Sequence, residues 1–133
     1  MSIQTIIRDG DPEALVAYAE KHGSALHKQH RLTTSQIRSV FSRVRKIQAD
    51  WQPDDVTGLE RAKRELQLLK PRLAYQAAKE RGKGVDELKD ILTTAIDEVF
   101  AGTDDNIVLT QRFRNFVDLF EALLAYHRAA GGR

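Results

Sequence analysis

Histidine is the residue type in this chain best suited to hold a metal ion, and three of the four histidines stand close together. His27 and His30 are separated by two residues, and His22 precedes them. Two imidazoles at this spacing could bind a transition metal. The segment around His27 and His30, residues 24–31, contains no cysteine and no acidic residue and is mostly polar. The sequence therefore favours a solvated loop here and predicts no metal site.

Patterns that would support catalysis are missing from the sequence. There is no His-Glu-x-x-His segment of a zinc protease and no glycine-rich phosphate loop. The absence of cysteine excludes disulfides, thiolate zinc sites and cysteine nucleophiles. His127 stands near the end of the last predicted helix, where a cation suits the negative helix end, so we interpret it as structural. The sequence predicts no catalytic residue, no cofactor and no enzymatic activity.

Charged residues are distributed unevenly along the chain, although the formal net charge is only +2. Residues 27–48 contain six basic residues and no acidic one, and residues 58–84 contain eight basic residues against three acidic ones. Residues 85–106 contain seven acidic residues and a single lysine. Because arginine and lysine bind phosphate groups, the two basic blocks favour a polyanion on one face. The acidic block suits a basic partner or a second copy of the chain.

The element that positions the first basic block is a helix over about residues 33–49. Thr33 and Gln36 have the spacing of a capping box, which marks the start of a helix. Apolar residues follow at steps of three and four, which is the helical period; they are Ile37, Val40, Phe41, Val44 and Ile47. The basic residues of the segment fall off this stripe, so we expect them to face solvent or a ligand.

The second basic block lies on a predicted helix that begins near Thr57 or Gly58. Pro71 lacks a backbone donor and clashes with the preceding turn, so we expect the helix to kink or restart there. The segment Gly82-Lys83-Gly84 should end it.

Three further features complete the predicted architecture. One helix starts at Asp11-Pro12 and should stop at Gly23. Apolar periodicity predicts helices over residues 85–100 and from about 107 to 130, the latter with Phe113, Phe116 and Phe120 buried. Residues 1–10 show weak structure, and we expect a flexible arm there. The sequence thus predicts an all-α fold, a compact bundle of about five helices in a single domain over residues 1–133.

No apolar run approaches the ~18 residues that a membrane span requires. The first residues also lack the basic and apolar pattern of a secretory signal. We therefore expect a soluble, cytoplasmic protein.

Three segments resemble, in the same order, the small subunit of type III-A (Csm) CRISPR effector complexes. They are Leu32–Arg38, Leu69–Tyr75 and Phe116–Arg128, and with the trailing glycines they extend over residues 32–132. Gln76 departs from the family pattern, in which we expect a small residue, and Arg81–Gly84 is a glycine-rich variant. Residues 1–30 match nothing that we can place in the family.

The resemblance implies a non-catalytic, all-α subunit. Several copies would line an RNA-guided complex beside the other Csm subunits and contact target RNA paired with the CRISPR RNA. Arg38, Lys70 and Arg72 lie inside the resembling segments, and charge adds four more residues. The predicted RNA-binding residues are Arg38, Arg45, Lys46, Lys70, Arg72, Lys79 and Arg81.

Other interpretations stay open on the sequence alone. The chain could be a helical adaptor whose basic faces meet acidic proteins. It could also be a helical DNA-binding domain that uses residues 33–49 as its recognition helix, although a tight helix-turn-helix arrangement is missing. A homodimer of the isolated protein stays open as well.

Overall fold

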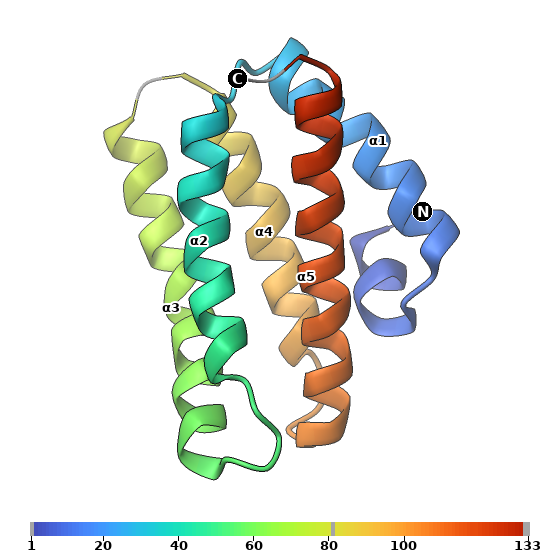
Figure 1. Cartoon of the computed structure of the whole chain (residues 1–133), viewed down its shortest axis with the longest axis vertical. Coiled ribbons are helices and arrows are strands. Elements are labelled where there is room, and N and C mark those ends of the chain that lie inside the picture. Colours follow the sequence, from blue (N-terminus) through green and yellow to red (C-terminus); the bar gives the residue numbers. More distant parts are fainter. Residues whose placement is uncertain (1, 81, 132–133) are drawn as a thin grey trace.

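The computed structural model describes residues 2–80 and 82–131, and over these residues the chain is a bundle of helices (Figure 1). Within them lie five α-helices and one short π-helix, and no residue belongs to a strand. The helices are η1 (Thr5–Asp9), α1 (Pro12–Lys28), α2 (Thr34–Asp50), α3 (Val56–Lys79), α4 (Gly84–Phe100) and α5 (Asn106–Ala129). The all-α prediction is confirmed, and the predicted count of about five helices omits η1.

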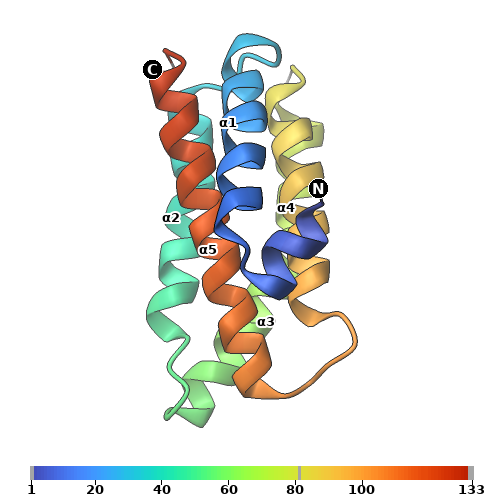
Figure 2. The same ribbon diagram turned by 90° about the vertical axis from the view of Figure 1, so that its right-hand side faces the viewer.

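Helix α5 occupies the middle of the bundle. It packs against α1, α2, α4 and η1, while α3 packs against α2 and α4. Figure 2 shows α1 lying over α4 and α5, with α2 and α3 behind them. Phe113, Phe116 and Phe120 of α5 are buried in the core, as predicted. None of the helices in the described part of the chain is both long and apolar enough to cross a membrane.

The capping box predicted at the start of α2 is present. The Thr33 hydroxyl accepts a hydrogen bond from the Gln36 backbone N–H at 3.1 Å, and the Gln36 side-chain oxygen accepts from the Thr33 N–H at 3.0 Å. The Gln36 amide also donates to the Glu80 carboxylate at 3.1 Å. This second contact ties the start of α2 to the end of α3, so the two basic blocks are held side by side.

Gly23 does not stop α1, which continues to Lys28. The glycine is buried against α5, where a Cβ atom would stand only 2.8 Å from the Leu123 carbonyl oxygen. A glycine at this position permits close approach of α1 and α5 rather than ending the helix. The expected loop around His27 is therefore wrong, because this residue belongs to α1.

Helix α3 does not restart at Pro71 but runs without interruption from Val56 to Lys79. It begins one residue earlier than expected, with the Asp55 carboxylate accepting from the Gly58 N–H at 3.1 Å. Pro71 is exposed, whereas Leu69 and Leu73 on either side of it are buried. Burial on both sides of the proline holds the helix together across it, which outweighs the lost backbone hydrogen bond.

The flexible arm expected at residues 1–10 is also wrong over the described residues 2–10. Ile6 and Ile7 of η1 are completely buried. The Asn115 side-chain amide donates to the Ile7 carbonyl oxygen at 2.8 Å, and the Arg8 guanidinium pairs with Glu98 at 2.7 Å. Ile3, Ile6 and Ile7 have the spacing of one helical face, but a period this short does not show that the turn packs on α5 and α4.

His127 is fully buried, and its Nε2 atom hydrogen-bonds the Leu32 carbonyl oxygen. Its ring meets the ring of His27 edge-on, with centroids 5.5 Å apart. These contacts link the last turn of α5 to the connection between α1 and α2. They agree with the structural role expected for His127.

Candidate nucleic-acid interface

The outer face of α2 has a one-sided composition. Its exposed positions from residue 35 to residue 49 carry only basic residues, serine and alanine. They are Ser35, Arg38, Ser39, Ser42, Arg43, Arg45, Lys46 and Ala49. A helical surface of cations and hydroxyl donors without a carboxylate is suited to phosphate oxygens.

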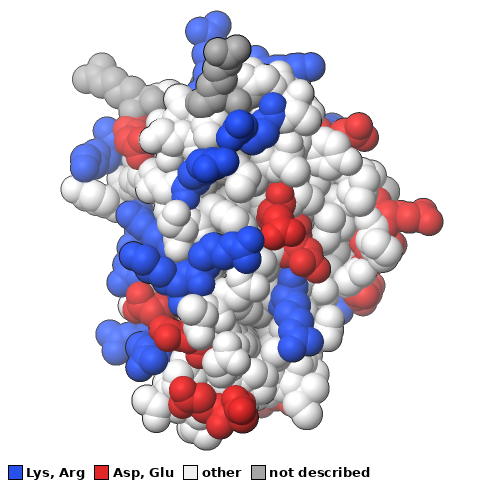
Figure 3. Space-filling view, viewed as in Figure 1, with Lys and Arg blue, Asp and Glu red and all other residues white. Residues whose placement is uncertain are grey.

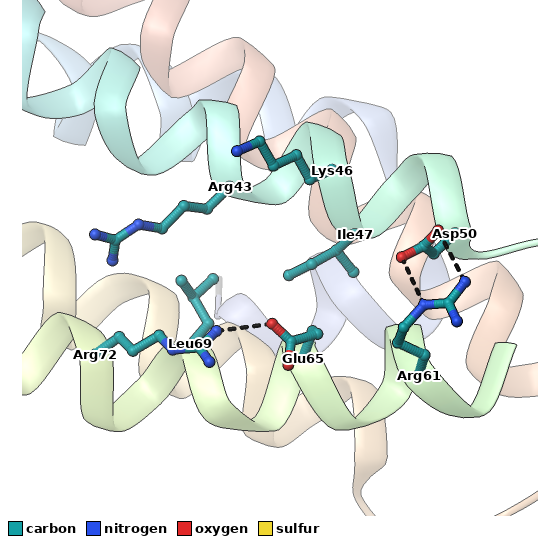
Figure 4. A pocket seen from close by; sticks show the side chains of 8 residues that line it. All are labelled: Arg43, Lys46, Ile47, Asp50, Arg61, Glu65, Leu69 and Arg72. Atoms are coloured by element: carbon teal, nitrogen blue, oxygen red, sulfur yellow. Dashed lines mark hydrogen bonds and ion pairs between the residues drawn. The ribbon is translucent and has the colours of Figure 1, made fainter. Parts of the chain in front are cut away.

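A hollow of about 480 Å³ lies between α2 and α3 (Figure 4). Buried Ile47 of α2 and Leu69 of α3 line it, and charged side chains surround these apolar groups. At one end Arg61 pairs with Asp50, with its Nε atom 3.1 Å from Oδ2. This hydrogen bond and the Asp50 charge raise the pKa of Arg61. Arg43 and Lys46 reach the hollow from α2, and Figure 4 shows Arg43 extending toward the gap between the helices.

A second hollow of about 370 Å³ continues along α3 and shares Arg43 and Arg72 with the first. Tyr75 and Lys79 also line it. Because the two hollows share residues, they form one groove between α2 and α3, which we call the basic groove. It is defined by the cations Arg43, Lys46, Arg72 and Lys79 together with the residues between them.

The acidic residues of the basic groove are already engaged. Asp50 is paired with Arg61, Glu65 accepts from Arg72 at 2.8 Å, and Glu80 accepts from the Gln36 amide. Among the described residues, Arg43, Lys46 and Lys79 have no ion-pair partner.

Figure 3 shows Lys and Arg side chains gathered over α2 and α3, with Asp and Glu more prominent at the lower end and along the right-hand edge of this face. With five basic residues against three acidic ones in its lining, the groove presents a net positive charge to a ligand.

The sequence of this helical chain was compared with models of known protein families. A family model described as Csm2 Type III-A matches residues 9–133. The chain belongs to the Csm2 type III-A family. No curated protein and no solved structure matches it. As a Csm2-family protein it is the small subunit of the type III-A CRISPR effector complex, where it acts with other Csm subunits.

The Csm2 fold brings three of the predicted RNA-binding residues together in the groove. These residues are Lys46, Arg72 and Lys79. Arg38 and Arg45 are exposed on the outer face of α2 and line neither hollow, and Arg45 contacts α5. The Arg45 guanidinium is 3.1 Å from the Glu121 carboxylate of α5 and sits 4.8 Å from the centroid of the Phe41 ring.

Lys70 is directed away from the basic groove. Its ammonium is 2.6 Å from the Asp97 carboxylate of α4, on the other side of α3. Lys70 therefore contributes to the packing of α3 against α4 in this structure. Arg81, the remaining predicted residue, lies outside the described residues.

Arg43 is the groove residue that the sequence reasoning left out of its predicted site. The signal was present in the helical period, since Arg43, Lys46, Ile47 and Asp50 are spaced by three and four residues and share the α3-facing side of α2. Knowing which side of α2 faces α3 required the packing of the two helices.

The acidic block of the Csm2-family chain lies largely on α4. Asp86 and Asp90 are exposed and both contact the Lys89 ammonium, at 3.0 and 3.3 Å. These two carboxylates raise the pKa of Lys89. Within the described part of the chain, no three His, Asp or Glu side chains are grouped so that they could hold a metal ion.

Proposed function

We propose that this chain is a non-catalytic small subunit of the type III-A complex that binds the RNA backbone through the basic groove and the outer face of α2. The observation that carries the proposal is that Arg43, Lys46 and Lys79 have no ion-pair partner among the described residues and line one groove between α2 and α3. The Arg61–Asp50 ion pair and the Gln36–Glu80 hydrogen bond join these two helices. Arg38 and Arg45 extend the surface across α2, and Arg72 gains a phosphate contact by exchanging its partner Glu65.

This arrangement supports backbone recognition rather than base reading. In RNA-guided complexes, pairing between guide and target selects the sequence, while the protein contacts phosphates and shape. Cations fixed on helices meet that requirement. The chain then supplies a surface along which target RNA paired with CRISPR RNA can lie, and it supplies no reacting group. Other subunits and further copies of the chain would extend the surface.

The test is binding of the purified chain to single-stranded RNA of about 40 nucleotides across a salt series. The groove variant is Arg43→Ala/Arg72→Ala/Lys79→Ala. We expect weaker binding and a salt dependence that is shallower by about 2 log units of affinity per log unit of salt, because each lost phosphate contact in a single strand removes about 0.7.

The matched control is Arg8→Ala/Lys21→Ala/Lys89→Ala, which removes the same charge from η1, α1 and α4. It should bind RNA like the unchanged chain, since these residues lie outside the groove. Equal losses in both variants would indicate an effect of net charge alone. If neither the free chain nor the assembled complex loses RNA affinity in the groove variant, the groove is not the RNA surface. DNA of the same sequence tests the preference for RNA.

A further inference from the structure

We propose that Tyr75 is a stacking platform for one unpaired base of the bound RNA, placed in the basic groove between phosphate-binding cations. The inference rests on the proposed RNA-binding function and deepens it. It assigns a contact to the base, where the cations contact only the backbone.

The Tyr75 ring is available for such a contact. The residue is 70% exposed and stands one turn before the C-terminal end of α3, which is Lys79. Its exposed neighbours at three- and four-residue spacing are the compact Pro71 and Ala78 and the flexible cations Arg72 and Lys79. Pro71 and Ala78 leave room for a flat base to approach the ring, and the two cations can contact the phosphates on either side of that base. Aromatic rings stack on any base, because every base has a π-face.

The surroundings of Tyr75 favour nucleic acid as the occupant. The ring shares its hollow with Arg43, Arg72 and Lys79, whose charges attract a phosphate backbone. The one acidic group lining that hollow is Glu80, and its carboxylate accepts a hydrogen bond from Gln36 at 3.1 Å. Proteins that bind single-stranded nucleic acids combine a cationic groove with exposed aromatic rings, and the surroundings of Tyr75 have both features.

The stacked base has to be unpaired. A base within a duplex has neighbours on both of its faces, so a protein ring can reach it only where the strand is single or the base is displaced. The proposal therefore commits to RNA with at least one unstacked nucleotide at the groove.

The experiment compares the full chain with Tyr75→Ala and Tyr75→Phe, using a single-stranded RNA that carries one 2-aminopurine. Affinity and 2-aminopurine fluorescence are measured at several salt concentrations. We expect the unchanged chain to quench 2-aminopurine fluorescence when the base stacks on the Tyr75 ring. Tyr75→Ala should weaken binding by about 5- to 150-fold, the range for loss of one stacked base, and should abolish this quenching. Its salt dependence should stay unchanged, since no phosphate contact is lost. Tyr75→Phe should restore both signals. Ile107→Ala, which truncates an exposed apolar residue of α5, is the control and should change neither.

The outcomes separate this inference from the RNA-binding proposal. If the chain binds RNA through the groove cations but Tyr75→Ala changes neither affinity nor quenching, the stacking role is overturned and RNA binding stands. If Tyr75→Ala instead reduces co-purification with the other Csm subunits and leaves RNA binding intact, Tyr75 is a protein contact. Failure of the unchanged chain and of its assembled complex to bind RNA would overturn both proposals.

Discussion

Gly23 illustrates how a single residue sets the distance between two helices. Replacing it with alanine places a Cβ atom 2.8 Å from the Leu123 carbonyl oxygen and 2.9 Å from the Tyr126 Cβ atom. Overpacking of this kind costs about 1–3 kcal/mol. Alanine favours the helix by about 1 kcal/mol, which offsets part of that cost. We expect Gly23→Ala to lower the free energy of unfolding by up to about 2 kcal/mol in urea denaturation.

The control for this prediction is Ser39→Ala on the exposed face of α2, where a good helix former is introduced without a clash. It should leave stability unchanged or raise it slightly. A rise in stability for Gly23→Ala would show that α1 and α5 separate at little cost.

His22 gives the fold a sensitivity to acid. Its ring stacks on Tyr18 with centroids 4.0 Å apart. Burial lowers the pKa of His22, Lys21 lowers it further, and Glu87 raises it in part. With the folded-state pKa below the unfolded value near 6.5, the unfolded chain binds the proton more tightly. Stability is therefore lost as the pH falls through that value toward the folded-state pKa.

We expect His22→Gln to lose less free energy of unfolding than the unchanged chain when the pH is lowered from about 7.5 to about 5. Urea denaturation of both proteins at the two pH values provides the measurement. Parallel losses in the two proteins would assign the acid sensitivity to other groups.

At the scale of the helix, the start of α2 depends on a local signal. Thr33→Ala removes the side-chain acceptor of the Gln36 N–H. Loss of such a cap costs about 1 kcal/mol. We expect a lower midpoint in thermal or urea unfolding. If the first turn of α2 also frays, RNA binding should weaken as well. Ser35→Ala, exposed two residues further on, is the control and should have little effect. An unchanged midpoint for Thr33→Ala would mean that the contact between Gln36 and Glu80 holds the helix start alone.

The helices differ in how far the sequence could predict them. Features set by neighbouring residues in the chain were predictable, and features set by contacts with distant residues were not. The capping box of α2 and the apolar period of α4 are local, and both were predicted within a residue or two. Gly23 and Pro71 carry local signals for interruption, but burial against distant residues overrides them. The turn at Ile6 and Ile7 packs on α5, α4 and α1, and the short apolar period of Ile3, Ile6 and Ile7 does not show these partners.

The same distinction applies to the candidate site. Charge alone identified the two helices that form the basic groove. It could not tell which cations face the groove, because that depends on how each helix is rotated against its neighbours. The predicted site therefore omits Arg43, which lines the groove, and includes Lys70, which is directed toward Asp97.

On the scale of the whole molecule, positive and negative charge are separated between the α2–α3 side and α4. We propose that the acidic surface of α4, with Asp86 and Asp90 exposed, contacts a basic partner subunit or the basic face of the next copy. A contact between unlike faces of identical chains repeats along an array rather than closing into a pair.

Charge reversal tests this surface. Asp86→Lys/Asp90→Lys should weaken co-purification with the other subunits of the complex, because like charges then oppose each other. The control Asp9→Lys/Glu20→Lys makes the same change in net charge on η1 and α1 and should assemble normally. Normal assembly of the α4 variant would leave its acidic surface as a solvated face.

The packing of α1 against α5 has a consequence for how the protein is made. The ribosome delivers η1 and α1 first and α5 last, yet α5 is the helix on which α1 chiefly packs. A hydrogen bond between His127 Nε2 and the Leu32 carbonyl joins the end of α5 to the connection after α1. These two residues are 95 residues apart in the chain. During synthesis α1 and the isoleucines of η1 stay without their partner until α5 has emerged. A prematurely terminated chain that lacks α5 would therefore expose these apolar surfaces, and such products should be targets for chaperones and proteases.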